Sequence, residues 1–319
     1  MDSIYSLPER RDRVVASLAA IAGGTKEIVR LNKDSIISEH HVNVSFSQVF
    51  GGAPNTFVAS EVGRLIDSVR LVVSGPQGGE LFACDGIALP IHSRLYENQV
   101  VPTVTFGTPT VGNFAFELHY ANDEAKTDMM SALDGESAAQ VSLELTFSSV
   151  STGVLSGGTT PGAITFGVEV LSCDYNPLAF VDETGDLMPE YTGIASSRHF
   201  VRQNNATATA SGKQEILLEV GNLTRNLMLI AETAAGALSD TLITDVSLVV
   251  GGVERRVGTW TAFKSLAASK LGVDDTGVCV LEWGDDARGW FNLIGAQQAR
   301  LVMTFSDAGN VRCVQDYTS

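Results

Sequence analysis

Proline, charged side chains and long apolar runs are all scarce in this chain of 319 residues. The nine prolines lie at or before Pro189, so the remaining sequence contains none. Charged residues make up only 18%, below the usual quarter or so, which indicates that much apolar surface is buried in cores or subunit interfaces. No apolar run approaches the roughly 18 residues of a membrane span, and no signal-peptide segment is recognisable. We therefore expect a soluble protein that is not secreted by the general route.

Cysteine, histidine and catalytic motifs are sparse as well. The four cysteines form no CxxC pair, which predicts small buried side chains in a protein made in a reducing compartment. His40 and His41 follow Glu39, but adjacent strand residues point to opposite faces, so these two histidines cannot chelate one ion together. No GxSxG, HExxH, P-loop or GxGxxG motif occurs in a suitable context. The sequence therefore predicts neither an enzyme nor a cofactor.

Charge is unevenly distributed along the chain. The net charge is −16, which disfavours a general nucleic-acid-binding surface. Residues 1–33 nevertheless carry six arginines and lysines against four acidic residues, a net charge of +2, and leave −18 for the rest. Acidic pairs in the expected loops could bind calcium between subunits, but none has EF-hand spacing, so a structural calcium stays open and unassigned.

The chain contains two copies of one strand-like sequence segment. LIDSVRLVV at residues 65–73 returns as LITDVSLVV at residues 242–250, with six of nine positions identical. A second repeated segment occurs further on: QVSLELTFS at residues 140–148 resembles QARLVMTFS at residues 298–306. The order is the same in both halves, which indicates a duplicated domain. The offset falls from 177 to 158 residues between the two repeated segments, so the first copy holds about nineteen extra residues.

Alternating apolar residues and turn signals predict eight strands in each copy. In the first copy we expect strands at residues 36–46, 56–62, 66–74, 80–84, 100–106, 113–120, 140–147 and 163–172. In the second copy we expect them at residues 213–220, 226–231, 242–250, 253–257, 277–283, 289–294, 299–305 and 310–317. Short helices are expected at residues 90–97, 123–133 and 261–271.

The N-terminal segment is expected to form a helix over residues 6–22. Ser6 to Glu9 has the capping-box pattern, Gly23-Gly24 would end the helix, and Val14, Leu18 and Ile21 share one face. A second short segment follows at residues 27–31. We interpret residues 1–33 as an amphipathic arm that lies outside both repeats, so neither core should need it.

These observations predict an all-β protein of two tandem eight-stranded jelly-roll β-sandwiches with short helices and an N-terminal amphipathic helix. The predicted divisions are an arm at residues 1–33, a first jelly roll at 34–175, a linker at 176–212 and a second jelly roll at 213–319. Residues 204–212 of the linker are of low complexity.

The tandem jelly rolls, marked by the repeated segments 65–75 with 242–252 and 140–148 with 298–306, resemble the double jelly-roll major capsid proteins. These are the coat proteins of tectiviruses, corticoviruses, finnlake-type phages, adenoviruses and their relatives. The resemblance covers residues 36–317 and is architectural. Its compact length and short loops are most similar to the small bacteriophage members.

The resemblance implies a non-enzymatic structural protein: the major capsid protein of a small icosahedral, membrane-containing bacteriophage, made in the host cytoplasm and located in the virion. Homotrimers with a pseudo-hexagonal footprint would tile the shell. Other partners would be neighbouring trimers, minor capsid and vertex proteins and an inner lipid membrane, without sequence-specific nucleic-acid binding. The residues facing that membrane or interior would be Arg10, Arg11, Arg13, Lys26 and Arg30.

Two alternatives remain open at this point. The first is a trimeric receptor- or carbohydrate-binding sandwich, such as a viral spike, fibre or lectin-like module. The aromatic residues that could then stack on sugars are Trp260, Trp283, Trp290 and Phe291. The second is a glycan-active enzyme on the same scaffold, which would need a pair of carboxylates on one concave sheet. No such pair can be assigned from the sequence.

Overall fold

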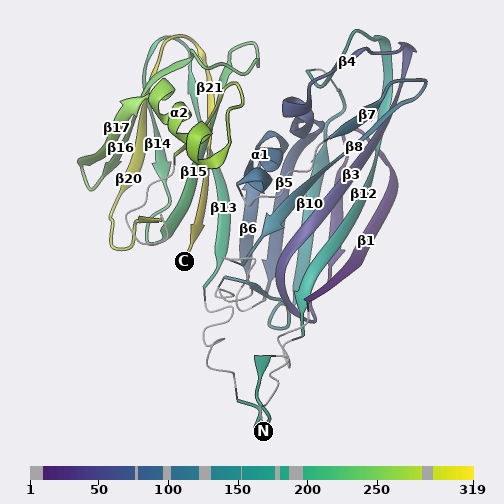
Figure 1. The fold of residues 1–319 in the computed structure, drawn as a ribbon, viewed down its shortest axis with the longest axis horizontal. Helices are drawn as coiled ribbons and strands as arrows, with labels where there is room; N and C mark the ends of the chain where they lie inside the picture. The colour runs from purple at the N-terminus through teal and green to yellow at the C-terminus, as the bar shows by residue number, and fades with distance from the viewer. Residues whose placement is uncertain are drawn as a thin grey trace. The chain divides into compact units, whose positions relative to one another are not determined.

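A computed structural model describes residues 10–75, 78–95, 102–121, 131–151, 153–176, 180–186, 197–281 and 290–319. The chain divides into two compact units, Met1–His199 and Phe200–Ser319. In both units the strands pair in antiparallel sheets (Figure 1). No helix within the described ranges is long and apolar enough to cross a membrane.

The first unit is a sandwich of two sheets. Its elements are β1 (Arg10–Ala22), β2 (Lys26–Leu31), β3 (Ile36–Gly52), β4 (Thr56–Phe57), η1 (Ala59–Leu65), β5 (Ile66–Ser74), β6 (Gly79–Cys84), η2 (Gly86–Ala88), α1 (Leu89–Arg94), β7 (Thr103–Thr105), β8 (Thr110–His119), β9 (Leu133–Asp134), β10 (Gln140–Phe147), β11 (Leu155–Ser156) and β12 (Thr159–Tyr175). One sheet has the order β1-β12-β3-β8-β7, with β9 joined to β3, and the other runs β6-β5-β10-β2. Phe147 of β10 stacks on Phe166 of β12 with ring centroids 4.7 Å apart, so the core lies between the sheets.

The second unit repeats this arrangement. Its elements are β13 (His199–Ala208), β14 (Gly212–Leu218), β15 (Leu223–Thr233), β16 (Ile243–Val250), β17 (Val253–Thr259), α2 (Trp260–Leu271), β18 (Val278–Leu281), β19 (Phe291–Asn292), β20 (Ala299–Phe305) and β21 (Gly309–Thr318). The strands pair in the orders β18-β15-β21-β13, with β19 joined to β15, and β14-β20-β16-β17. Helix α2 contacts β16, β17 and β18 (Figure 1). Its Trp260 is buried in the core of the unit.

The pairing register confirms the predicted duplication. In the first unit Leu71 of β5 lies opposite Leu143 of β10, and in the second unit Leu248 of β16 lies opposite Leu301 of β20. The flanking core pairs correspond in the same way, so Val69, Leu71 and Val73 occupy the sheet positions of Val246, Leu248 and Val250. Both offsets found in the sequence, 177 and 158 residues, are therefore the offsets of structurally equivalent strands.

Irregularities in the sheets are duplicated too. The β5–β6 ladder shifts register between Leu71 and Val72, and the β16–β17 ladder shifts between Leu248 and Val249, the equivalent place. A second shift, where β5 pairs with β10 near Phe147, recurs where β16 pairs with β20 near Phe305. Bulges change strand twist and direction, so their recurrence indicates that the two units inherited one backbone path.

The predicted N-terminal helix is wrong for the residues that the structure describes. Residues 10–22 form strand β1, which pairs with β12 from Arg10 opposite Tyr175 to Ala22 opposite Thr165. Residues 26–31 form strand β2 at the edge of the other sheet. Residues 1–9, including the expected cap Ser6-Glu9, lie outside the described residues. The segment is therefore part of the first sandwich and not an arm outside it.

A bulge accounts for part of the helix-like spacing of this strand. The β1–β12 register shifts between Val14 and Ala16 and again between Leu18 and Ile21, with Ala20 in the left-handed region at φ 59°. The second bulge sets Leu18 and Ile21 on one face although they are three residues apart, as in a helix, whereas the first bulge puts Val14 on the opposite face, where it is 55% exposed. When the pairing with β12 is not known, the spacing of the apolar residues in this segment cannot be distinguished from that of an amphipathic helix.

The other expected elements have mixed outcomes. The helix at residues 261–271 is confirmed as α2, and the helix expected at residues 90–97 corresponds to α1 over Leu89–Arg94, with residues 96 and 97 outside the described ranges. The strand expected at residues 56–62 is instead the short β4 followed by the 3₁₀ helix η1. Residues 123–130 of the expected inserted helix lie outside the described residues, as does Trp283. Strand β13 lies within the stretch expected as a linker.

Candidate functional site: a carboxylate–histidine cluster

Four ionisable side chains converge where β3 and β8 pair. The antiparallel register sets Glu39 opposite His119 and His41 opposite Glu117. Side chains alternate between the two faces of a strand, so Glu39 and His41 share one face and meet Glu117 and His119 of the neighbouring strand. His40 points to the other face, where its Nδ1 lies 2.7 Å from the hydroxyl of Tyr120. This confirms that His40 and His41 do not point at one site.

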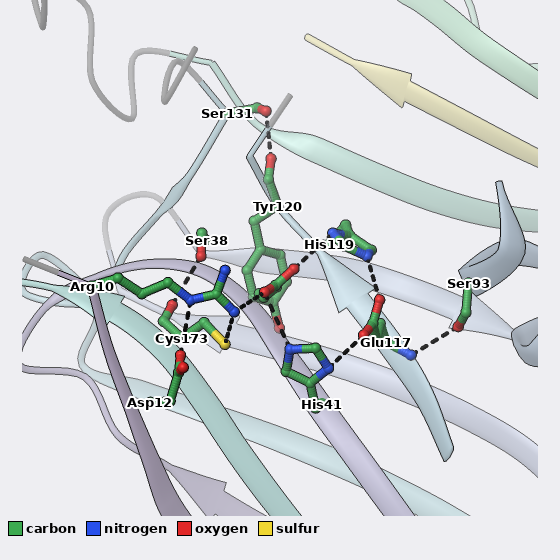
Figure 2. Close-up of polar contacts among 11 residues, drawn as sticks. Arg10, Asp12, Ser38, His41, Ser93, Glu117, His119, Tyr120, Ser131 and Cys173 are labelled. Atoms are coloured by element: carbon green, nitrogen blue, oxygen red, sulfur yellow. Dashed lines mark hydrogen bonds and ion pairs between the residues drawn. The ribbon is translucent and has the colours of Figure 1, made fainter. Parts of the chain in front are cut away.

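The four side chains form a closed ring of contacts (Figure 2). His41 Nε2 lies 3.2 Å from Glu39 Oε1, and His41 Nδ1 lies 2.5 Å from Glu117 Oε1. His119 Nδ1 lies 3.1 Å from Glu39 Oε2, and His119 Nε2 lies 2.8 Å from Glu117 Oε2. Each imidazole thus bridges the two carboxylates, one on the Oε1 side and one on the Oε2 side.

Strand β1 closes one side of this ring. The guanidinium of Arg10 donates to Glu39 Oε1 at 2.8 Å and lies 3.0 Å from Cys173 Sγ on β12, while its Nε donates to Asp12 (Figure 2). On the β8 side, the backbone N–H of Glu117 donates to the hydroxyl of Ser93 in α1. The cluster is therefore held by the N-terminal strand, three further strands and a helix of the same unit.

Burial makes the charges of the cluster costly unless they are compensated. Glu39, Glu117 and His119 are only 3–4% exposed. Burial alone lowers the pKa of His41, but hydrogen bonds with Cys173, Glu117 and Glu39 outweigh burial and raise that pKa to about 12. Burial raises the pKa of Glu117, but hydrogen bonds with His119 and His41 outweigh it and lower the pKa to about 2. The ring thus stabilises the charged forms of both groups.

These shifts predict how the stability of the fold depends on pH. The pKa of Glu117 in the folded protein lies below its ordinary value of 4.5, so its contribution is present above that pH and is lost as the pH falls through about 2. The pKa of His41 is raised, so its contribution is present below its ordinary value of 6.5 and is lost as the pH rises through about 12.

We therefore expect acidification from about pH 5 to about pH 3 to lower the free energy of unfolding less in Glu117→Gln than in the wild type, because the amide has no proton to take up. Urea unfolding at both pH values measures this difference. Glu169→Gln is the control, since Glu169 is an exposed carboxylate on β12. An acid sensitivity of Glu117→Gln equal to that of the wild type would contradict the assignment.

The five basic residues expected to face a membrane or interior differ in their contacts within the first sandwich. Arg13 donates twice to the buried Asp174, at 2.9 and 2.6 Å, and Arg10 belongs to the cluster described above. Lys26 pairs with Glu144 at 2.7 Å. All five residues are exposed, and Arg11 and Arg30 make no ion pair with another described residue. Three of the five thus make ion pairs within the first sandwich.

Sequence reasoning missed the cluster because it considered the histidines of one strand alone. The signal was present as two Glu-x-His patterns, Glu39-x-His41 and Glu117-x-His119, each in an expected strand. Two such patterns on paired strands place two carboxylates and two imidazoles on one face. Cys173 joins them through the β3–β12 register, which sets it opposite Glu39.

Two groups within the cluster have donor atoms close enough together to bind a metal ion. Glu39, Glu117 and His119 form one group, and Glu39, His41 and Cys173 form the other, with ligand atoms within 4.8 Å of one another in each. Carboxylate oxygen, imidazole nitrogen and thiolate sulfur are all ligands of divalent transition metals.

Comparison with known proteins places the fold. No protein-family model matches the sequence, and no curated protein matches it significantly. Among solved structures, the STIV MCP matches with a TM-score of 0.72 at 13% identity, over 97% of this chain and 96% of that one. The major capsid protein P2 from bacteriophage PM2 matches with a TM-score of 0.61 at 12% identity, over 98% and 97%. The Faustovirus major capsid protein matches with a TM-score of 0.61 at 9% identity, over 100% and 92%.

These similarities extend over both units of the chain, and the register of paired strands is repeated between the units. At such low identity they establish the architecture. The chain has the double jelly-roll fold of these major capsid proteins.

Proposed function

We propose that this protein is the major capsid protein of an icosahedral virus and that its function is to build the shell. The observation that carries the proposal is the presence of two register-matched jelly rolls in a chain that spans 96% of the STIV MCP and 97% of the PM2 protein P2. A protein with another role could use one jelly roll. Two equivalent jelly rolls in one chain suit a subunit that must present similar surfaces to several neighbours.

The proposed mechanism is geometric and requires no catalysis. Three subunits contribute six similar sandwiches, so a trimer has a pseudo-hexagonal outline that can tile a surface. Exposed apolar residues on edge strands of the second unit suit contacts between subunits: Leu217 on β14 is 61% exposed, and Val253 and Val257 on β17 are 56% and 63% exposed. Burial of these side chains between subunits would favour association.

We further propose a bacterial host and an inner membrane, as expected for the small members of the fold. The similar structures come from viruses as different as bacteriophage PM2 and Faustovirus, so the host is a separate question from the fold. Arg11 and Arg30 are exposed and make no ion pair with another described residue, so they suit an anionic lipid surface, where each contributes about 1 kcal/mol. The ion pairs of Arg10, Arg13 and Lys26 would have to open before these side chains could bind an anionic lipid surface.

Mass photometry of the purified protein tests the oligomeric state. We expect a species of three times the 33.8 kDa chain at micromolar concentration. A glycan array run in parallel tests the receptor-binding alternative and should give no signal for a coat protein. A stable monomer, or glycan binding by a protein that does not assemble, would contradict the proposal.

A further inference from the structure

The first unit carries a buried charged cluster that its fold does not need. In the second unit β15 pairs with β18 as β3 pairs with β8. When the register shift at Ser38 is matched to the one at Arg225, the His41–Glu117 pair corresponds to Met228 opposite Val280. Met228 and Val280 are only 1% and 2% exposed. The jelly roll thus accommodates an apolar pair at this position. Buried charges give no general gain in stability over well-packed apolar residues, so their presence in the first unit calls for a specific role.

The contacts of Arg10 distinguish the two candidate groups of metal ligands. The guanidinium lies against Glu39 Oε1 and Cys173 Sγ, so a cation held by Glu39, His41 and Cys173 would be adjacent to a fixed positive charge. The Oε2 atoms of Glu39 and Glu117 instead both face His119, at 3.1 and 2.8 Å. This side offers two carboxylates and one imidazole, which suits a divalent cation in charge and in ligand type.

We propose that Glu39, Glu117 and His119 bind one divalent transition-metal ion of the zinc class per chain. The imidazole favours zinc-like ions over calcium and magnesium, which prefer all-oxygen sites. The ion would bind one ring nitrogen of His119 in place of its hydrogen bond to one Oε2 atom, and the other ring nitrogen would keep its hydrogen bond to the second carboxylate. His41 contacts both Oε1 atoms and would orient the carboxylates from behind, as outer partners of metal ligands commonly do. The ion would join β3 to β8 in the first unit.

The experiment uses the full-length protein, stripped with a chelator and then dialysed against Zn²⁺ or Co²⁺. We expect about one equivalent of zinc per chain by elemental analysis and a visible absorption band with Co²⁺. Zinc at about a hundred times its Kd should raise the Tm by roughly 5–10 °C, because it binds only the folded chain. Calcium at the same concentration should have little effect.

Three variants test the ligand assignment. His119→Ala should lose the cobalt band and the zinc-dependent rise in Tm, while Glu169→Gln, on the same sheet but outside the cluster, should keep both. The double variant His41→Met with Glu117→Val copies the apolar pair of the second unit, so it should fold and bind no zinc. Zinc below about 0.1 equivalents in the wild type, equal binding by His119→Ala, or a rise in Tm with calcium alone would overturn the proposal.

Discussion

Deletion of residues 1–22 is expected to prevent the first unit from folding. The deletion removes β1, which pairs with β12 from Arg10 to Ala22, and it exposes the edge of β12. It also removes Arg10 and Arg13, the basic partners of Glu39 and Asp174, whose side chains are only 5% and 2% exposed. Both carboxylates keep other partners, His41 and His119 for Glu39 and Ser35 for Asp174, so each lost arginine costs about 1–2 kcal/mol and the larger loss is the whole β1–β12 ladder.

Expression of the truncated chain should therefore give aggregated protein, or soluble protein whose strands in the first unit exchange amide hydrogens rapidly. Two single variants serve as matched controls on the same strand. Arg11→Ala changes an exposed side chain and should shift the free energy of unfolding by less than about 0.5 kcal/mol, whereas Arg13→Ala should lower it by about 1–2 kcal/mol. A truncated chain with a cooperative transition within about 3 °C of the wild type would show that β1 is dispensable.

Leu143→Ala and Leu301→Ala are expected to destabilise their own units by similar amounts. Both leucines are 0% exposed and occupy equivalent positions, opposite Leu71 and Leu248. Removing a buried leucine side chain leaves a cavity and costs about 2–5 kcal/mol. Amide hydrogen exchange should accelerate in β5 and β10 for Leu143→Ala, and in β16 and β20 for Leu301→Ala.

Leu217→Ala is the control for these variants because Leu217 lies on β14 of the second unit but is 61% exposed. Its effect on the free energy of unfolding should stay within about 0.5 kcal/mol. If Leu301→Ala lowered the free energy of unfolding as little as Leu217→Ala, the equivalence of the core positions 143 and 301 would be wrong.

The duplication was predictable from the sequence because its signal is local. Val69, Leu71 and Val73 are buried, and their counterparts Val246 and Leu248 are identical in type and equally buried. The positions that differ between the copies include Asp67 and Arg70, which are exposed. Core packing constrains the buried residues of a strand and leaves the exposed ones free, so the repeated segment marks the inward face.

Strand β1 could not be predicted because the information that defines it is distant in the chain. Its partner residues on β12 lie between Thr165 and Tyr175, and two bulges remove the alternation that would mark a strand. The same holds for β13, whose alanine, threonine and asparagine residues resemble a linker until β21 is placed beside it. Tertiary pairing overrides local pattern in both segments.

Only part of the carboxylate–histidine cluster could be predicted from the sequence. The Glu-x-His spacing on each strand follows from the sequence, but the meeting of the two strands depends on a register that no local pattern specifies. A one-residue slip would send Glu117 and His119 to the core face and bring Phe116 and Leu118 out. Register is fixed here by the burial of those apolar neighbours, which are 0% exposed.

Electron microscopy of the purified protein at high concentration tests the central claim, that this chain builds a shell. We expect trimeric particles with a pseudo-hexagonal outline that associate into closed shells or flat hexagonal arrays. Images that show only dispersed monomers, with no ordered assembly across a range of salt and protein concentrations, would contradict it.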